Sequence, residues 1–147
     1  MLAVFAVGCG DEEVATTPTT ATGEPPTKRE FISEADRICF SADSQIEAAA
    51  DDLALAEREP PPAEVRRIVL GVVVPALETE VRAIGSLGAP RGDEAAVEEI
   101  LAATERGIAQ IEAEPEAVLE GPPPALRQAG RLARAYGSQE CGIRPAG

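Results

Sequence analysis

Histidine, tryptophan and asparagine are all missing from this 147-residue chain, and lysine occurs only once, as Lys28. Without an imidazole the chain cannot build a Ser-His-Asp or Cys-His catalytic site, and it has no histidine to bind zinc or haem. One tyrosine and three phenylalanines offer few aromatic walls for a ligand pocket. We therefore expect a protein that is not an enzyme and binds no cofactor.

The net charge of -13 comes from 26 acidic residues against 13 basic ones. DNA and RNA bind proteins through cations that displace counterions from phosphates, so nucleic acid is a poor partner. An anionic lipid surface is repelled for the same reason, and any membrane attachment needs something other than a basic patch. The length suits one domain, with a core built from alanine, valine, leucine and isoleucine.

Residues 1–9 form an apolar run that ends at Cys9. With Ala6, Val7 and Gly8 before the cysteine, the run resembles the end of a bacterial lipoprotein signal peptide. The resemblance implies cleavage before Cys9 and acylation of its thiol, and two acyl chains anchor a protein stably. The run is short and has no basic start, so we expect the true start codon upstream of Met1. A chance apolar N-terminus with a stray cysteine is the alternative.

Residues 10–28 contain six threonines, three prolines and three glutamates. Such a segment cannot bury enough apolar surface to offset its ordering entropy, which predicts a disordered tether. The tether is either a bare linker or a target for O-glycosylation.

The remaining chain, 29–143, is predicted to be an all-α domain, an up-down-up-down four-helix bundle. Thr27 and Glu30 form a capping-box pattern before a helix over about 28–58, and Pro60, Pro61 and Pro62 end it. A second helix over about 62–86 should kink at Pro75. Asp93 is predicted to cap a third helix, in which Gly107 weakens the helix unless a neighbour needs the close approach. A single helical turn near 116–120 and a last helix over about 124–138 complete the prediction. In the first, third and last of these helices, the following apolar residues are expected to face the core: Phe31, Ala35, Ile38, Ala42, Ala49, Val97, Ile100, Leu101, Ile108, Ile111, Leu126, Ala129, Leu132 and Ala133.

If Cys9 is lipidated, Cys39 and Cys141 remain as a pair in an oxidising compartment. In an antiparallel four-helix arrangement the last helix ends near the start of the first, which favours a disulfide over two buried free thiols. The stretches 31–39 and 135–142 also resemble a group of small uncharacterised lipoproteins of GC-rich bacteria. That resemblance supports export and the disulfide, and it implies no activity.

Four sets of side chains are candidate sites. Glu98, Glu105 and Glu112 share a helix face, but no EF-hand spacing accompanies them, so a solvated face is preferred to a calcium site. Asp36 and Asp43 are expected to be surface acids that pair with arginines. Tyr136 is expected to anchor the core, with its hydroxyl on a backbone carbonyl or water. The basic strip of the last helix either contacts an acidic partner or an anion, or forms ion pairs with neighbouring glutamates (Arg127, Arg131 and Arg134).

Together these features predict a non-enzymatic lipoprotein on the outer face of the cell membrane, anchored in lipid through Cys9. Its helical surface would bind an unknown envelope protein. The alternative is a module that binds a small ligand between helices near the Pro75 kink. A deep apolar cavity would favour the ligand, and a filled core would favour the protein partner.

Overall fold

The computed structural model describes residues 23–54 and 59–142, and every regular element in those ranges is a helix. In chain order the elements are α1 (Lys28–Ala54), α2 (Pro62–Ile68), the π-helix η1 (Val69–Val73), α3 (Val74–Ser86), α4 (Glu94–Ala113), the 3-10 helix η2 (Pro115–Glu120) and α5 (Pro124–Tyr136). The predicted all-α class is confirmed. Cys9, the predicted tether up to residue 22 and the end of the first predicted helix at 55–58 lie outside the described residues.

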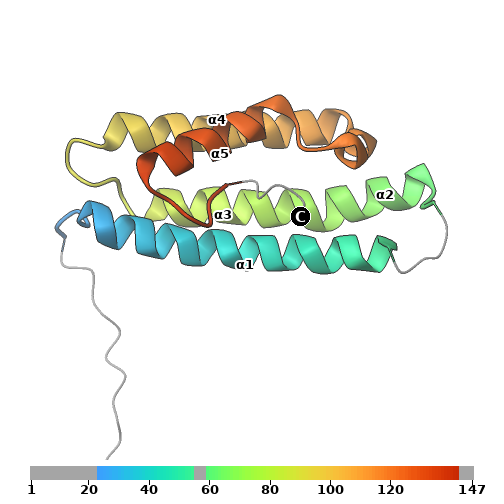
Figure 1. Ribbon diagram of the computed structural model, residues 1–147, viewed down its shortest axis with the longest axis horizontal. Coiled ribbons are helices and arrows are strands. Elements are labelled where there is room, and N and C mark those ends of the chain that lie inside the picture. Colours follow the sequence, from blue (N-terminus) through green and yellow to red (C-terminus); the bar gives the residue numbers. More distant parts are fainter. Residues whose placement is uncertain (1–22, 55–58, 143–147) are drawn as a thin grey trace, which may run out of the picture.

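The helices form two layers in Figure 1, with α1 beside the α2–α3 segment and α5 against α4. Along the chain, α1, the continuous α2–α3 segment, α4 and α5 alternate in direction, so the end of α5 reaches the beginning of α1. There the rings of Phe31 and Tyr136 meet edge to face, with centroids 6.1 Å apart. This end of the molecule carries the disulfide.

The predicted capping box begins α1. The backbone N–H of Thr27 donates to Glu30 Oε2 over 2.8 Å, and the Glu30 N–H donates back to Thr27 Oγ1 over 3.3 Å. These bonds satisfy two of the amides that a helix N-terminus leaves without partners. The hydrogen bond from the Thr27 side chain also lowers the pKa of Glu30.

Pro75 shapes the second predicted helix, which runs without a break from α2 through η1 into α3. Proline has no N–H for the carbonyl four residues earlier, and its ring crowds the preceding turn. The chain widens there into the π-helical turn Val69–Val73, a common response to an obstructed hydrogen-bond ladder. The predicted kinked helix is confirmed, and Val72, Val73 and Val74 lie within it.

Gly107 lets α4 and α5 approach closely. A Cβ at this position would lie 2.5 Å from Leu126 Cδ2 and 3.0 Å from the Leu126 backbone nitrogen. Gly130 and Ala129 on the facing side of α5 are also buried. Gly107 was expected to weaken its helix, and the structure shows that Leu126 of α5 leaves no space for a larger residue there.

Two apolar clusters make up the core. The cluster near the kink contains Val65, Val69, Val74, Leu77, Ile108 and Ile111. The cluster near the disulfide contains Phe31, Ala35, Cys39, Ile84 and Val97. Valine, isoleucine and leucine make up the first cluster, and alanine, isoleucine and valine are three of the five residues of the second, in line with the composition.

Candidate functional site

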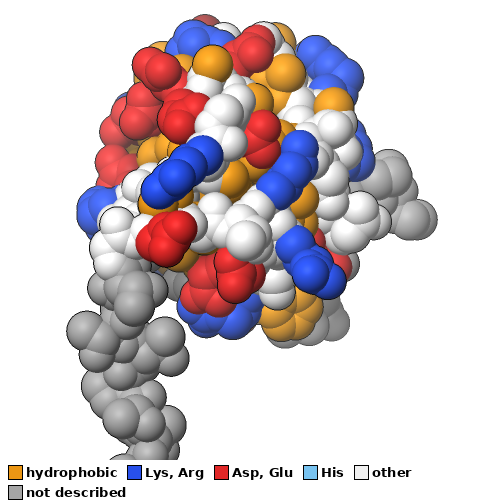
Figure 2. Space-filling model, turned by 90° about the vertical axis from the view of Figure 1, so that its left-hand side faces the viewer, with side chains coloured by type: hydrophobic (Ala, Val, Ile, Leu, Met, Phe, Trp, Pro, Cys, Tyr) orange, Lys and Arg blue, Asp and Glu red, His pale blue; other side chains and the backbone are white. Residues whose placement is uncertain are grey.

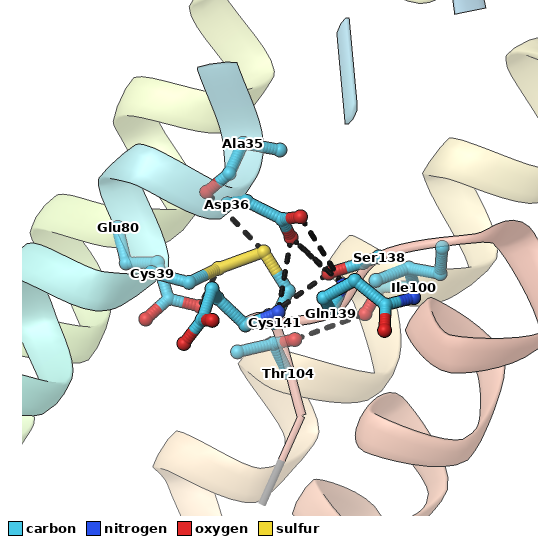
Figure 3. Close-up of a disulfide and its surroundings, with 10 residues drawn as sticks. Ala35, Asp36, Cys39, Glu80, Ile100, Thr104, Ser138, Gln139 and Cys141 are labelled. Carbon is cyan, nitrogen blue, oxygen red and sulfur yellow. Dashed lines mark hydrogen bonds between the residues drawn. A yellow bond between two sulfur atoms is a disulfide. The ribbon is translucent and has the colours of Figure 1, made fainter. Parts of the chain in front are cut away.

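The chain turns back on itself immediately after α5. Gly137 has a φ of 123°, which favours glycine, and the N–H groups of Gly137 and Ser138 bond back to the carbonyls of Arg134 and Ala133. This is the Schellman arrangement that commonly ends helices. It directs residues 138–141 across α1, where Cys141 forms a disulfide with Cys39, with an S–S distance of 2.06 Å and Cα atoms 5.1 Å apart (Figure 3).

Asp36 holds the same segment by hydrogen bonds. Its Oδ1 accepts the Ser138 hydroxyl and the backbone N–H of Glu140, the latter over 3.1 Å, and the N–H of Gln139 lies 3.2 Å from both carboxylate oxygens (Figure 3). The expectation that Asp36 pairs with an arginine is wrong for this residue. Its partners come from a segment whose path depends on the Gly137 turn.

Glu80 of α3 reaches the disulfide from the other side. Its Oε1 lies 3.5 Å from Cys39 Sγ, and Cys39 itself is only 1% exposed. Burial, and then the nearby charge of Asp43, raises the pKa of Glu80 from 4.5 to about 7. A disulfide sulfur has no hydrogen to donate, so the protonated carboxyl is the form that can donate to it.

Tyr136 is tied to the start of α4. Its hydroxyl donates to Asp93 Oδ2 over 2.8 Å, and Lys28 Nζ lies 4.0 Å from the ring centroid and 3.7 Å from the same carboxylate oxygen. Burial, followed by the bond to Asp93, raises the pKa of Tyr136. Asp93 occupies the predicted capping position, but its side chain makes no capping hydrogen bond. The predicted N-cap position is therefore confirmed, but the carboxylate makes tertiary contacts instead of a capping hydrogen bond. The tyrosine bonds to this carboxylate rather than to a backbone carbonyl or water.

An open groove runs between α3 and α4. It consists of two adjoining hollows of about 520 and 380 Å³ that share Gly85, Leu101 and Glu105. The groove floor is apolar and contains Val81, Ile84, Gly85, Ala89, Val97, Leu101, Ala102 and Ile108. We call this feature the α3–α4 groove.

Glutamates surround that floor. The rim contains four glutamates and one arginine, all of them exposed: Glu78, Arg82, Glu94, Glu98 and Glu105. None of the four carboxylates forms an ion pair with another described residue. Figure 2 shows the end of the molecule at which α4 begins, with acidic side chains gathered on its upper left side and apolar surface between them.

The structure does not place Glu98, Glu105 and Glu112 at one site, although the sequence pattern puts them on one helix face. Glu98 and Glu105 line the groove, whereas Glu112, one heptad further on, does not. The sequence did not predict the groove, because nothing in it indicates that Gly85, which has no side chain, lies on the side of α3 that faces α4. Within the described ranges, no group of three or more acidic or cysteine side chains is placed to hold a metal ion.

The predicted basic strip on α5 is exposed at all three positions, Arg127, Arg131 and Arg134. Arg127 donates to the carbonyl of Pro122 and lines a separate hollow of about 430 Å³ beside η2. Neither Arg131 nor Arg134 lines that hollow. None of the three arginines lines the α3–α4 groove.

A cavity inside the disulfide-end cluster has a volume of only about 30 Å³. That is about the volume of one water molecule in the liquid, too little for a small ligand. Pro75 is exposed, and it lines neither this cavity nor the α3–α4 groove.

No protein-family model, curated protein or solved structure matches this chain. Its chemistry is therefore inferred from its own residues. Among the described helices, none is long and apolar enough to cross a membrane.

Proposed function

We propose that the protein is a lipid-anchored protein of the bacterial cell envelope that binds another protein through its helical surface. The observation that carries this proposal is the Cys39–Cys141 disulfide, which joins residues 102 positions apart. Disulfides persist in oxidising compartments and are rare in the reducing cytosol, so this one favours export. The apolar run before Cys9 supports the same location, because it resembles a lipoprotein signal.

The α3–α4 groove supports a protein partner over a small ligand. Small-ligand sites are concave and mostly apolar, and they enclose most of their ligand. The apolar cavity of the core has about 30 Å³, whereas the groove is a long surface feature with a charged rim. An open apolar floor edged by polar groups has the character of an interaction surface.

Lipid attachment is tested by metabolic labelling with a fatty-acid precursor in a bacterial host that expresses the gene from its native locus. Label should appear in the wild-type protein in the membrane fraction and disappear in Cys9→Ser. An unlabelled wild-type protein in the soluble fraction would contradict the anchor.

The partner is tested by placing a photo-crosslinking residue at exposed positions on different faces of the described helices, in intact cells. Glu105 samples the α3–α4 groove, Glu112 the next part of α4, and Arg131 the exposed strip of α5. A reproducible crosslink to one envelope protein from one of these faces supports the proposal. Its failure at every position would contradict a protein-binding role.

A further inference from the structure

The shape of the α3–α4 groove suits a helix. Its floor on α4 extends from Val97 to Ile108, which is three helical turns or about 16 Å. Both walls are helices, and the described ranges offer no sheet edge to which a strand could be added. Helices pack by placing side chains into the gaps between those of their neighbours. An amphipathic helix laid along such a groove is a common form of recognition.

Gly85 makes a notch in the α3 wall. A Cβ placed there would meet only Leu101 Cδ1, at 3.9 Å, so ordinary space remains where other residues would have a side chain. Val81 and Leu101 beside the notch are half-buried and keep part of their apolar surface accessible. A large apolar side chain from a partner would cover this surface and gain the free energy of its burial.

The rim determines the charge of the partner. Four glutamates against one arginine give the rim a net charge of -3, within a chain whose net charge is -13. Complementary charge speeds association and selects the partner, while like charge opposes it. Acidic proteins and anionic lipids are therefore repelled from this surface.

A second copy of the chain does not fit the groove well. The basic element that it could offer is the exposed face of α5, which carries Arg127, Arg131 and Arg134. The two leucines of this helix, Leu126 and Leu132, are already half-buried within their own protein. The face supplies charge without an apolar residue for the notch.

We infer that the α3–α4 groove binds a basic amphipathic helix of another protein, whose lysines or arginines lie along the glutamate rim and whose apolar side chains enter at Gly85. This inference rests on the proposed function and specifies the chemistry of the partner. It can be tested on the purified protein, separately from location and anchoring.

The probe is a fluorescent peptide of about 18 residues with leucines at i, i+3, i+4 and i+7 among lysines, long enough to form a helix. A scrambled peptide of the same composition measures attraction by charge alone. We expect the amphipathic peptide to bind wild-type protein about tenfold more tightly than the scrambled one. Equal binding of the two peptides, or tighter binding of a leucine-glutamate peptide of the same pattern, would overturn the inference.

Two matched substitutions locate the binding. Glu105→Lys and Glu112→Lys make the same charge change one heptad apart on α4, but only Glu105 lines the groove. We expect Glu105→Lys to weaken binding about tenfold and Glu112→Lys to weaken it less than about twofold. Equal losses would show that the peptide responds only to net charge, and the inference would fail.

Gly85→Met fills the notch and separates folding from binding. Replacing a helical glycine that has free space around it should maintain or raise the melting temperature, since glycine disfavours helices. The variant should nevertheless bind the amphipathic peptide about tenfold more weakly. A variant that is folded and binds as wild type does would overturn the role of the notch.

The identity of the occupant is tested by the crosslinks from position 105 in cells and by sedimentation of the purified protein. A crosslinked partner segment with basic amphipathic spacing supports the inference. A crosslink from position 112 or 131 alone would leave the proposed function standing and overturn the groove as its site. Concentration-dependent dimers that Glu105→Lys abolishes would assign the groove to a second copy and overturn the inference.

Discussion

Asp36 and Ser138 are hydrogen-bonded across the same 102 sequence positions that separate Cys39 from Cys141. The two pairs lie one helical turn apart on α1, and both hold the segment that follows α5 (Figure 3). The Asp36 carboxylate accepts backbone amides of this segment as well, so it fixes the path of the chain that carries Cys141. A polar contact and a covalent bond thus hold the same segment.

Asp36→Ala should destabilise the folded protein by about 2–3 kcal/mol, because it leaves several donors of the segment 138–140 without a carboxylate acceptor. Urea unfolding of the oxidised protein measures the change. Asp51→Ala, on an exposed position of the same helix, should alter stability by less than about 0.5 kcal/mol. Equal effects of the two substitutions would contradict the role of Asp36.

Breaking the disulfide should cost about 4–5 kcal/mol in the chain-entropy account, since it releases a loop of 102 positions. The comparison is between oxidised and reduced protein in urea. The double variant Cys39→Ala/Cys141→Ala serves as the control, because a reductant should leave its midpoint unchanged. A reduced protein less than about 1 kcal/mol weaker would show that the contacts of Asp36 suffice.

Glu80→Gln should change how stability depends on pH. The pKa of Glu80 is raised from 4.5 to about 7 in the folded protein, so the folded state holds its proton at pH values where the unfolded chain has lost it. Wild-type stability therefore falls as the pH rises from 4.5 to 7, by up to about 3 kcal/mol from this group, and stays at that lower level above pH 7.

The neutral amide removes this loss, so the variant should gain stability relative to wild type as the pH rises from 5 to 8. Urea unfolding at several pH values tests this. Glu78→Gln, at an exposed position in the same helix, is the matched control and should follow wild type. A constant difference between wild type and Glu80→Gln over that pH range would show that the burial of Glu80 has no such cost.

Gly107→Ala and Gly71→Ala should have opposite effects. The added methyl at 107 meets the side chain and backbone nitrogen of Leu126, which should cost about 1–3 kcal/mol and push α4 and α5 apart. At 71 nothing lies within 4 Å of the added atom, and alanine should stabilise the helical turn by about 0.5–1 kcal/mol. Thermal unfolding of both variants measures the signs. A stabilised Gly107→Ala would contradict the close contact.

Local chemistry made much of the fold predictable. The capping pair Thr27 and Glu30, the start of a helix at Pro62 and the kink at Pro75 each depend on a few neighbouring residues, and the structure places α1, α2, η1 and α3 accordingly. The spacing of apolar residues identified the buried side of α1, α4 and α5 for the same reason.

Apart from the Cys39–Cys141 disulfide, the contacts between distant elements were not predictable from the sequence. Asp93 stands where a cap is expected, yet Tyr136 and Lys28 occupy its carboxylate because α5 ends beside α4. Gly85 and Glu105 form one groove only because of the way α3 and α4 cross. The sequence shows that these residues are present, but local patterns do not predict how the helices lie relative to one another.

The oxidation state of Cys39 and Cys141 in cells tests the central claim of export most directly. Thiols are blocked in intact cells before lysis, and the digested protein is then analysed by mass spectrometry without reductant. The account predicts a peptide pair joined through Cys39 and Cys141, the disulfide of the folded domain. Blocked, unjoined thiols at both positions in the native protein would contradict it.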